Sequence, residues 1–164
     1  MEAMKFWVSH GIVTGSGYNA KQGCKPYPFP PCDHHINNTD FLQCDKVPEH
    51  GYPPCYKKCQ SGYPLTYQQD KRYGKSAYGL STKVVDIQKE IMMNGPVEAS
   101  FSLYEDFEQY SSGIYVHRSG KYIGEHAAKV IGWGMEGRIP YWLVVKSWNM
   151  HWGEKGKTLL LIIR

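Results

Sequence analysis

Several features that would settle a function class are missing from this sequence. No apolar run approaches the roughly 20 residues that a membrane helix needs. The lysines and arginines are scattered and form no basic stripe of the kind that binds nucleic acid. There is no internal repeat and no low-complexity linker. We therefore expect neither a membrane nor a nucleic acid as a partner.

The size and composition are those of one globular domain. The chain has 164 residues and a net charge of +4, and it is 41% hydrophobic and 21% charged. A domain of this length buries roughly two-thirds or more of the surface that its unfolded chain exposes. The sequence therefore predicts a single domain with a real core.

Cysteine is confined to one part of the chain. All five cysteines fall between Cys24 and Cys59, and a glycosylation sequon begins at Asn37. This clustering suits an oxidising compartment, yet the first residues lack the basic and apolar blocks of a signal peptide. We therefore expect a chain cut out of a longer precursor. Five cysteines allow fifteen ways to form two disulfides with one thiol left over, and the sequence alone does not choose between them.

Hydrophobic periodicity predicts two helices and several short strands. A helix is expected over 2–10, with Gly11 able to cap it, and another from Ser81 or Thr82 to Asn94. Alternation predicts a half-buried strand over 97–103, and strand-like runs follow at 114–116, 127–133, 141–145 and 158–163. Successive strands on short turns indicate an antiparallel sheet or partial barrel. The Gly-, Pro-, Tyr- and Cys-rich stretch 14–75 shows little periodicity, so its cysteines are expected to staple it.

One histidine stands where a loop is expected to become a strand. His126 precedes the apolar run 127–133, and a strand entry is a usual place to present a side chain to a cleft. Its small or apolar neighbours would lower the pKa of the imidazole by desolvation. The alternative is an ordinary histidine with a satisfied hydrogen bond. The tryptophans that follow it are expected to be core residues: Trp133, Trp142, Trp148 and Trp152.

A metal site is a weaker alternative. The groups Cys32-x-His34 and Cys55-x3-Cys59 are dense in possible ligands. Their spacings are not those of common zinc modules, so we expect no metal and no cofactor.

Motifs in a fixed order resemble one known family. Gly124–Ala128 is followed by Ser147-Trp148-Asn149 and then Trp152-Gly153. Earlier parts of the match are Gly23–Tyr27, Pro30–His35, Tyr67–Gly74 and Asn94–Glu98. Together they resemble the histidine-bearing half of a papain-like cysteine peptidase of the cathepsin B type, which carries a cysteine-rich occluding loop.

The resemblance implies a fold and its boundaries. It implies an α+β right-hand lobe over 1–156, with an antiparallel sheet or half-barrel, a packed helix and a disulfide-rich loop at about 24–59. Residues 157–164 match poorly and are expected to form a tail. The family's N-terminal lobe, which carries the nucleophilic cysteine, lies before the point where this chain begins.

The resemblance also assigns the catalytic positions. In such enzymes a cysteine thiolate attacks the peptide carbonyl, and a histidine passes the proton to the leaving amine. His126 matches this histidine, and Trp148 matches the tryptophan that shields it. Lys146 occupies the position of the asparagine that orients the ring. A protonated lysine accepts no hydrogen bond, and about 4 Å from an imidazolium it would cost on the order of 4 kcal/mol at a dielectric of about 20.

For the loop, the resemblance implies the disulfides Cys32–Cys44 and Cys24–Cys59. Cys55 is left unpaired, because its family partner lies in the other lobe. His34 and His35 match the pair that holds the occluding loop and binds the substrate's C-terminal carboxylate, which gives peptidyl-dipeptidase activity. The alternative is two solvated loop histidines.

The family therefore implies peptide-bond hydrolysis by a cysteine-type endopeptidase or peptidyl-dipeptidase, lysosomal or extracellular, acting on peptide and protein substrates. Because the nucleophile is missing and Lys146 replaces asparagine, this chain alone is expected to be inactive. The alternatives are a non-catalytic pseudopeptidase that binds peptide or protein partners and, less favoured, a zinc-binding module.

Overall fold

The structure is a computed structural model, and it describes residues 1–33, 41–48 and 50–162. The chain divides into two compact units, where the sequence predicts a single domain. Unit 1 comprises Met1–Pro31 and Pro48–Gly79, and unit 2 comprises Cys32–Val47 and Leu80–Arg164. Each unit is described by itself. No helix in the described part of the chain is long and apolar enough to cross a membrane.

Unit 1 begins with helix α1 (Glu2–His10), as the periodicity predicts. The helix ends at Gly11, which has a φ of 71° and donates its backbone N–H to the carbonyl of Trp7. Two short strands, β1 (Gly15–Ser16) and β2 (Lys25–Pro26), then pair in parallel. Little else in unit 1 is regular, and isolated backbone bonds such as the Ile12–Arg72 bridge, side-chain hydrogen bonds and one disulfide connect its segments.

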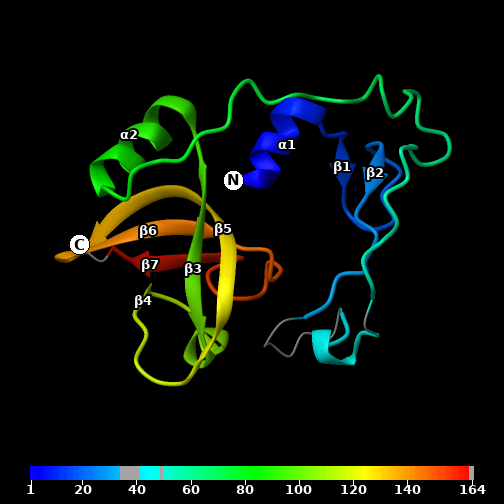
Figure 1. Ribbon diagram of the computed structural model, residues 1–164. Helices are drawn as coiled ribbons and strands as arrows, with labels where there is room; N and C mark the ends of the chain where they lie inside the picture. Colours follow the sequence, from blue (N-terminus) through cyan, green and yellow to red (C-terminus); the bar gives the residue numbers. More distant parts are fainter. Residues whose placement is uncertain (34–40, 49, 163–164) are drawn as a thin grey trace. The chain divides into compact units, whose positions relative to one another are not determined.

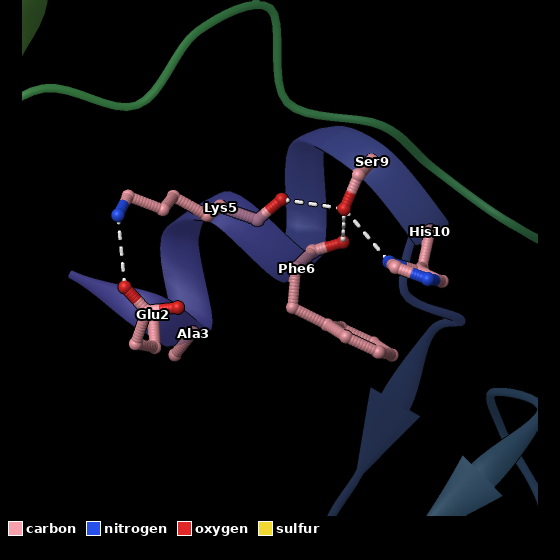
Figure 2. A pocket seen from close by; sticks show the side chains of 6 residues that line it. All are labelled: Glu2, Ala3, Lys5, Phe6, Ser9 and His10. Carbon is pink, nitrogen blue, oxygen red and sulfur yellow. Dashed lines mark hydrogen bonds and ion pairs between the residues drawn. The ribbon is translucent and has the colours of Figure 1, made fainter.

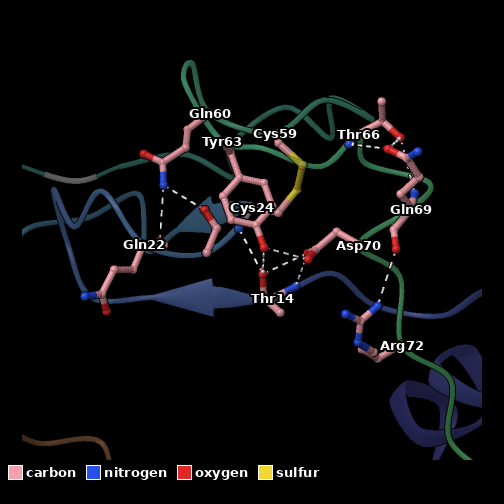
Figure 3. The surroundings of a disulfide bond; sticks show 11 residues. Thr14, Gln22, Cys24, Cys59, Gln60, Tyr63, Thr66, Gln69, Asp70 and Arg72 are labelled. Atoms are coloured by element: carbon pink, nitrogen blue, oxygen red, sulfur yellow. Dashed lines mark hydrogen bonds between the residues drawn. A yellow bond between two sulfur atoms is a disulfide. The ribbon is translucent and has the colours of Figure 1, made fainter.

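A buried carboxylate organises unit 1. Asp70 is fully buried, and its side chain accepts hydrogen bonds from the backbone N–H and hydroxyl of Thr14 and from the hydroxyl of Tyr63 (Figure 3). Burial raises the pKa of Asp70, but hydrogen bonds from Tyr63 and Thr14 outweigh it and bring the pKa below the ordinary value. The Cys24–Cys59 disulfide lies beside this network, because the Cys24 N–H donates to the Thr14 hydroxyl.

Unit 2 is built on one five-stranded sheet (Figure 1). Its strands are β3 (Val97–Tyr104), β4 (Ile114–Tyr115), β5 (Tyr122–Glu136), β6 (Ile139–Val145) and β7 (Lys157–Leu161). Their order is β3-β5-β6-β7-β4, and every neighbouring pair is antiparallel except β4 and β7, which are parallel. The expected α+β fold with an antiparallel sheet is confirmed, apart from that one parallel edge.

Two predicted boundaries differ from the observed ones. Helix α2 (Val84–Asn94) begins later than Ser81 or Thr82, because the Ser81 hydroxyl already bonds the side chain of Asp86 and the N–H of Lys83. The helix packs on β3 and β5. At the other end, the resemblance implies a tail over 157–164, whereas the sequence pattern predicts a strand-like run over 158–163. Lys157–Leu161 join the sheet as β7, in agreement with the pattern.

Two clusters of side chains form the core of unit 2. One contains Phe107, Tyr110, Trp148 and Trp152; the other contains Ala128, Val130 and Val144, with Ile91 of α2 packed against it. Phe101 and Leu160 touch both clusters and join them. The 3-10 helix η2 (Glu105–Gln109) supplies Phe107, which is fully buried. Of the four tryptophans expected in the core, Trp148 and Trp152 are buried and Trp133 and Trp142 are half-buried.

Candidate active site

His126 lies within β5 and not at its entry. The strand begins at Tyr122, because β3 is long enough to pair with Glu125, Gly124 and, across a register shift, Tyr122. In this register His126 stands directly opposite Phe101. The sequence interpretation of His126 as a strand-entry residue is therefore wrong, since a ladder partner far away in the sequence extends the strand.

Two aromatic rings flank the half-buried imidazole. The ring of Phe101 meets it edge to face, with centroids 5.9 Å apart and an interplanar angle of 89°. The ring of Trp148 lies 5.6 Å away at 42°. Trp148 is only 9% exposed and packs against Phe107 and Trp152 with ring centroids 5.8 and 4.9 Å apart. The histidine is thus held against a rigid aromatic wall, which restricts ring rotation and shields one side from water.

Lys146 is buried at the end of β6. Strand alternation places it on the same face as Trp142 and Val144, and its backbone N–H bonds the carbonyl of Gly156. Only 8% of the residue is exposed. Within the part of the chain that the structure describes, its Nζ has no hydrogen-bond partner. A lysine amine in this situation carries an unusually high desolvation cost.

The amine lies among four aromatic rings. Its Nζ is 3.4 Å from the ring centroid of Trp148 and 3.9 Å from that of Phe107. The rings of Trp152 and Phe101 lie at 4.7 and 5.4 Å. Burial lowers the pKa of Lys146 from 10.5 to about 7. The ring faces attract an ammonium and favour its charged form, which opposes part of that effect.

These contacts change the expectation for Lys146. From sequence it is a permanently charged donor that repels an imidazolium. In the structure it is an amine that can lose its proton near neutral pH, and a neutral amine has a lone pair and no charge. Its effect on His126 therefore depends on pH.

Asn149 belongs to the site, although the sequence predicts no role for it. Its φ is 77°, a conformation that asparagine tolerates better than most residues. The side-chain Oδ1 accepts the backbone N–H groups of His151 and Trp152, at 2.8 and 3.2 Å. Its Nδ2 donates to the carbonyl of Cys32 and to Oδ1 of Asp33, both at 3.3 Å. Asn149 thus ties the turn after Trp148 to the base of the disulfide-bonded segment.

Both disulfides that the resemblance implies are present. Cys24–Cys59 lies in unit 1 (Figure 3). Cys32–Cys44 lies in unit 2, and Cys55 is a free, exposed thiol. The 3-10 helix η1 (Cys44–Lys46) follows the second bridge. Three predicted positions, His34, His35 and the sequon at Asn37, lie outside the described residues. Asp33, immediately before them, is 1% exposed.

A zinc module of cysteine thiolates does not fit this arrangement. Four of the five cysteines are consumed in disulfides and supply no thiolate ligand. Among the described residues there is also no cluster of three or more histidine, cysteine or acidic side chains.

Two surface hollows lie in unit 1 and contain no residue of the His126 site. One, of about 430 Å³, runs along α1 past the Lys5–Glu2 ion pair and the stacked rings of Phe6 and His10 (Figure 2). The other, of about 570 Å³, is lined by prolines and tyrosines beside the Cys24–Cys59 bridge.

Comparisons with known proteins agree with the geometry. The sequence model of the family "Papain family cysteine protease" matches residues 1–161. "Cathepsin B-like cysteine proteinase 6" of Caenorhabditis elegans is 54% identical over 159 residues, which are 95% of this chain and 41% of that protein. "Cathepsin B-like cysteine proteinase 3" of Ostertagia ostertagi is 47% identical over 154 residues, covering 94% of this chain and 87% of that protein.

A solved structure shows the same fold. Procathepsin B S9 from Trypanosoma congolense superposes with a TM-score of 0.76 at 32% identity, covering 99% of this chain and 47% of that one. The chain spans less than half the length of the first relatives it matches. The chain belongs to the papain family of cysteine proteases and is similar to its cathepsin B-like members.

Proposed function

We propose that this chain supplies the histidine half of a cysteine peptidase active site, with His126 as the group that moves the proton. The observation that carries this function is the placement of His126 between Phe101 and Trp148 in a chain of this family. An imidazole that is held in place and shielded on one side is suited to take a proton from a thiol and return it to a leaving amine.

The thiol is proposed to come from a further lobe. Four cysteines of this chain are bridged, and the family resemblance assigns Cys55 to a disulfide with a cysteine of the other lobe. The relatives that match nearly all of this chain are mostly more than twice as long. A lobe from outside the matched region would bring the nucleophile, and the 164 residues alone would not cleave peptides.

The disulfide segment is proposed to restrict the site to substrate ends. His34 and His35 would bind a C-terminal carboxylate and confer peptidyl-dipeptidase activity. What supports this is the anchoring of the segment's base in unit 2 by the Cys32–Cys44 bridge and by Asn149. A substrate with a free C-terminal carboxylate should then be cleaved faster than the same substrate with an amidated end. The two disulfides also support a lysosomal or extracellular location.

A second candidate is a pseudopeptidase that binds peptides without cleaving them. The specific observation in its favour is Lys146, a buried amine close to the aromatic wall that His126 shares. While this amine is protonated, its positive charge would oppose the imidazolium that the peptidase cycle needs.

One experiment separates the two. The part of the C. elegans relative that this chain does not cover is fused to it, and hydrolysis of a dibasic fluorogenic peptide is measured with and without a thiol-alkylating inhibitor. The peptidase function predicts inhibitor-sensitive cleavage by the chimera and none by the 164-residue chain. A folded chimera that binds the peptide and leaves it intact would support the pseudopeptidase.

A further inference from the structure

Lys146 and His126 are neighbours across shared aromatic rings. The ring centroid of Trp148 lies 3.4 Å from Nζ of Lys146 and 5.6 Å from the centroid of the His126 imidazole. The ring centroid of Phe101 lies 5.4 Å from Nζ of Lys146 and 5.9 Å from the centroid of the imidazole. All of these residues belong to unit 2. Two ionisable groups that contact the same apolar rings are separated by little water, so a charge on one is felt strongly by the other.

No carboxylate in the described part of the chain neutralises the amine. The rings around it come from β3, η2 and the 147–156 turn, and His126 comes from β5. The titratable side chains on these elements are Glu98, Tyr104, Glu105, Asp106, Glu108, Tyr122, Glu125, His126, Lys129, Glu136, His151, Glu154 and Lys155.

Several of the nearby carboxylates are bound elsewhere. Asp106 accepts hydrogen bonds from Tyr115 and the backbone of Arg118, and Glu154 accepts the N–H of Gly113. Burial lowers the pKa of Lys146, with no contribution from a charged neighbour among the described residues. The imidazole is the ionisable group that shares the Trp148 and Phe101 rings with the amine.

We infer that Lys146 is a positioning residue for the proposed reaction and acts through His126: the protonated amine keeps the imidazole neutral, and the imidazole gains its proton readily only after the amine has released its own to solvent. This inference rests on the proposed function, because it concerns the imidazolium that protonates the leaving amine.

Two consequences follow for the reaction. Where the Lys146 amine is charged, an imidazolium at His126 is disfavoured. The amine that leaves the substrate then lacks its proton donor. Where the Lys146 amine is neutral, that electrostatic obstacle to the imidazolium is gone. The site therefore works above the pH at which Lys146 loses its proton, near neutrality, and is suppressed in acid. A residue that only packed the core would leave the protonation of His126 unchanged.

The test is an NMR titration of the 164-residue chain, which needs no catalytic activity. The histidine rings are isotopically labelled and the His126 signal is identified from a His126→Gln variant. Lys146→Met removes the charge while keeping an unbranched apolar side chain among the rings. Lys129→Met removes an exposed lysine of β5, the strand that carries His126, and serves as the matched control.

We expect the titration midpoint of His126 to rise by about one to two pH units in Lys146→Met, as an effective dielectric of about 20 implies for a unit charge at this range. Lys129→Met should leave the midpoint in place. Equal midpoints in the parent and Lys146→Met would overturn the inference.

The parent chain provides a second measurement that no folding defect of the variant can affect. The Cε signal of Lys146 should titrate near neutral pH, and the His126 signal should move in the same step. An amine that titrates at its ordinary pKa, with no response from His126, would also overturn the inference. If the coupling is present but the chimera described above cleaves nothing, the proposed function fails while the coupling stands.

Discussion

Replacing Lys146 by methionine should change how the stability of unit 2 depends on pH. Below about pH 7, Lys146 is protonated in both the folded and the unfolded chain, and the folded state bears the full cost of burying the charge. Between about pH 7 and 10.5 the unfolded chain still binds the proton and the folded chain does not. The free energy of unfolding of the parent therefore rises with pH across this window, and the methionine variant has no such rise.

The size of this effect follows from the pKa shift. A fall from 10.5 to about 7 corresponds to at most about 5 kcal/mol between the two protonation states. Attraction of the ammonium to the surrounding rings offsets part of it. We therefore expect a gain of about 1–3 kcal/mol for the parent between about pH 6 and pH 9.

Urea unfolding followed by tryptophan fluorescence measures this difference. Four of the five tryptophans belong to unit 2, so the signal reports mainly on that unit. Lys146→Met should be more stable than the parent at the acidic end, and the two should converge as the pH rises. Parallel stability curves for the two proteins would refute the placement of a charged amine in the aromatic cluster.

Three further predictions concern the rest of the molecule. Asp70→Asn should destabilise unit 1, because the pKa of Asp70 is lower in the folded chain than in the unfolded chain. The stabilisation from Asp70 is present above its unfolded-state pKa and is lost as the pH falls through its folded-state pKa. Limited proteolysis of unit 1 against pH measures this, and equal protection of parent and variant in acid is expected. Thiol labelling without reductant should modify Cys55 alone, so a second labelled cysteine would contradict the disulfide pairing. Asn149→Ala should speed hydrogen exchange around Asp33, with Asn94→Ala as the control, and unchanged exchange would remove the anchoring role.

Local patterns predicted the elements of this fold better than their ends. Alternation over 97–103 identifies β3, and the glycine after His10 marks the end of α1. The start of β5 was missed because it depends on pairing with β3, a contact between residues about twenty positions apart. Whether a strand extends by four residues is decided by its partner's length, which no local window contains.

The candidate site divides in the same way. The aromatic residue beside His126 was expected from the motif that contains Trp148, because motif spacing carries over between relatives. The surroundings of Lys146 were not expected from the sequence. The aromatic rings around its amine come from three separate segments, and only the folded chain brings them together. The sequence predicts no role for Asn149, because its partners Cys32 and Asp33 lie more than one hundred positions away.

The most direct test of the central claim is the effect of His126→Ala on kcat/KM of the chimera. If His126 moves the proton, its loss should lower kcat/KM by about 10²–10⁴-fold, the usual contribution of a general acid–base group. His151→Ala, which removes an exposed histidine of the turn after Trp148, should leave kcat/KM within about twofold. Inhibitor-sensitive cleavage that survives His126→Ala undiminished would show that the proton chemistry resides elsewhere.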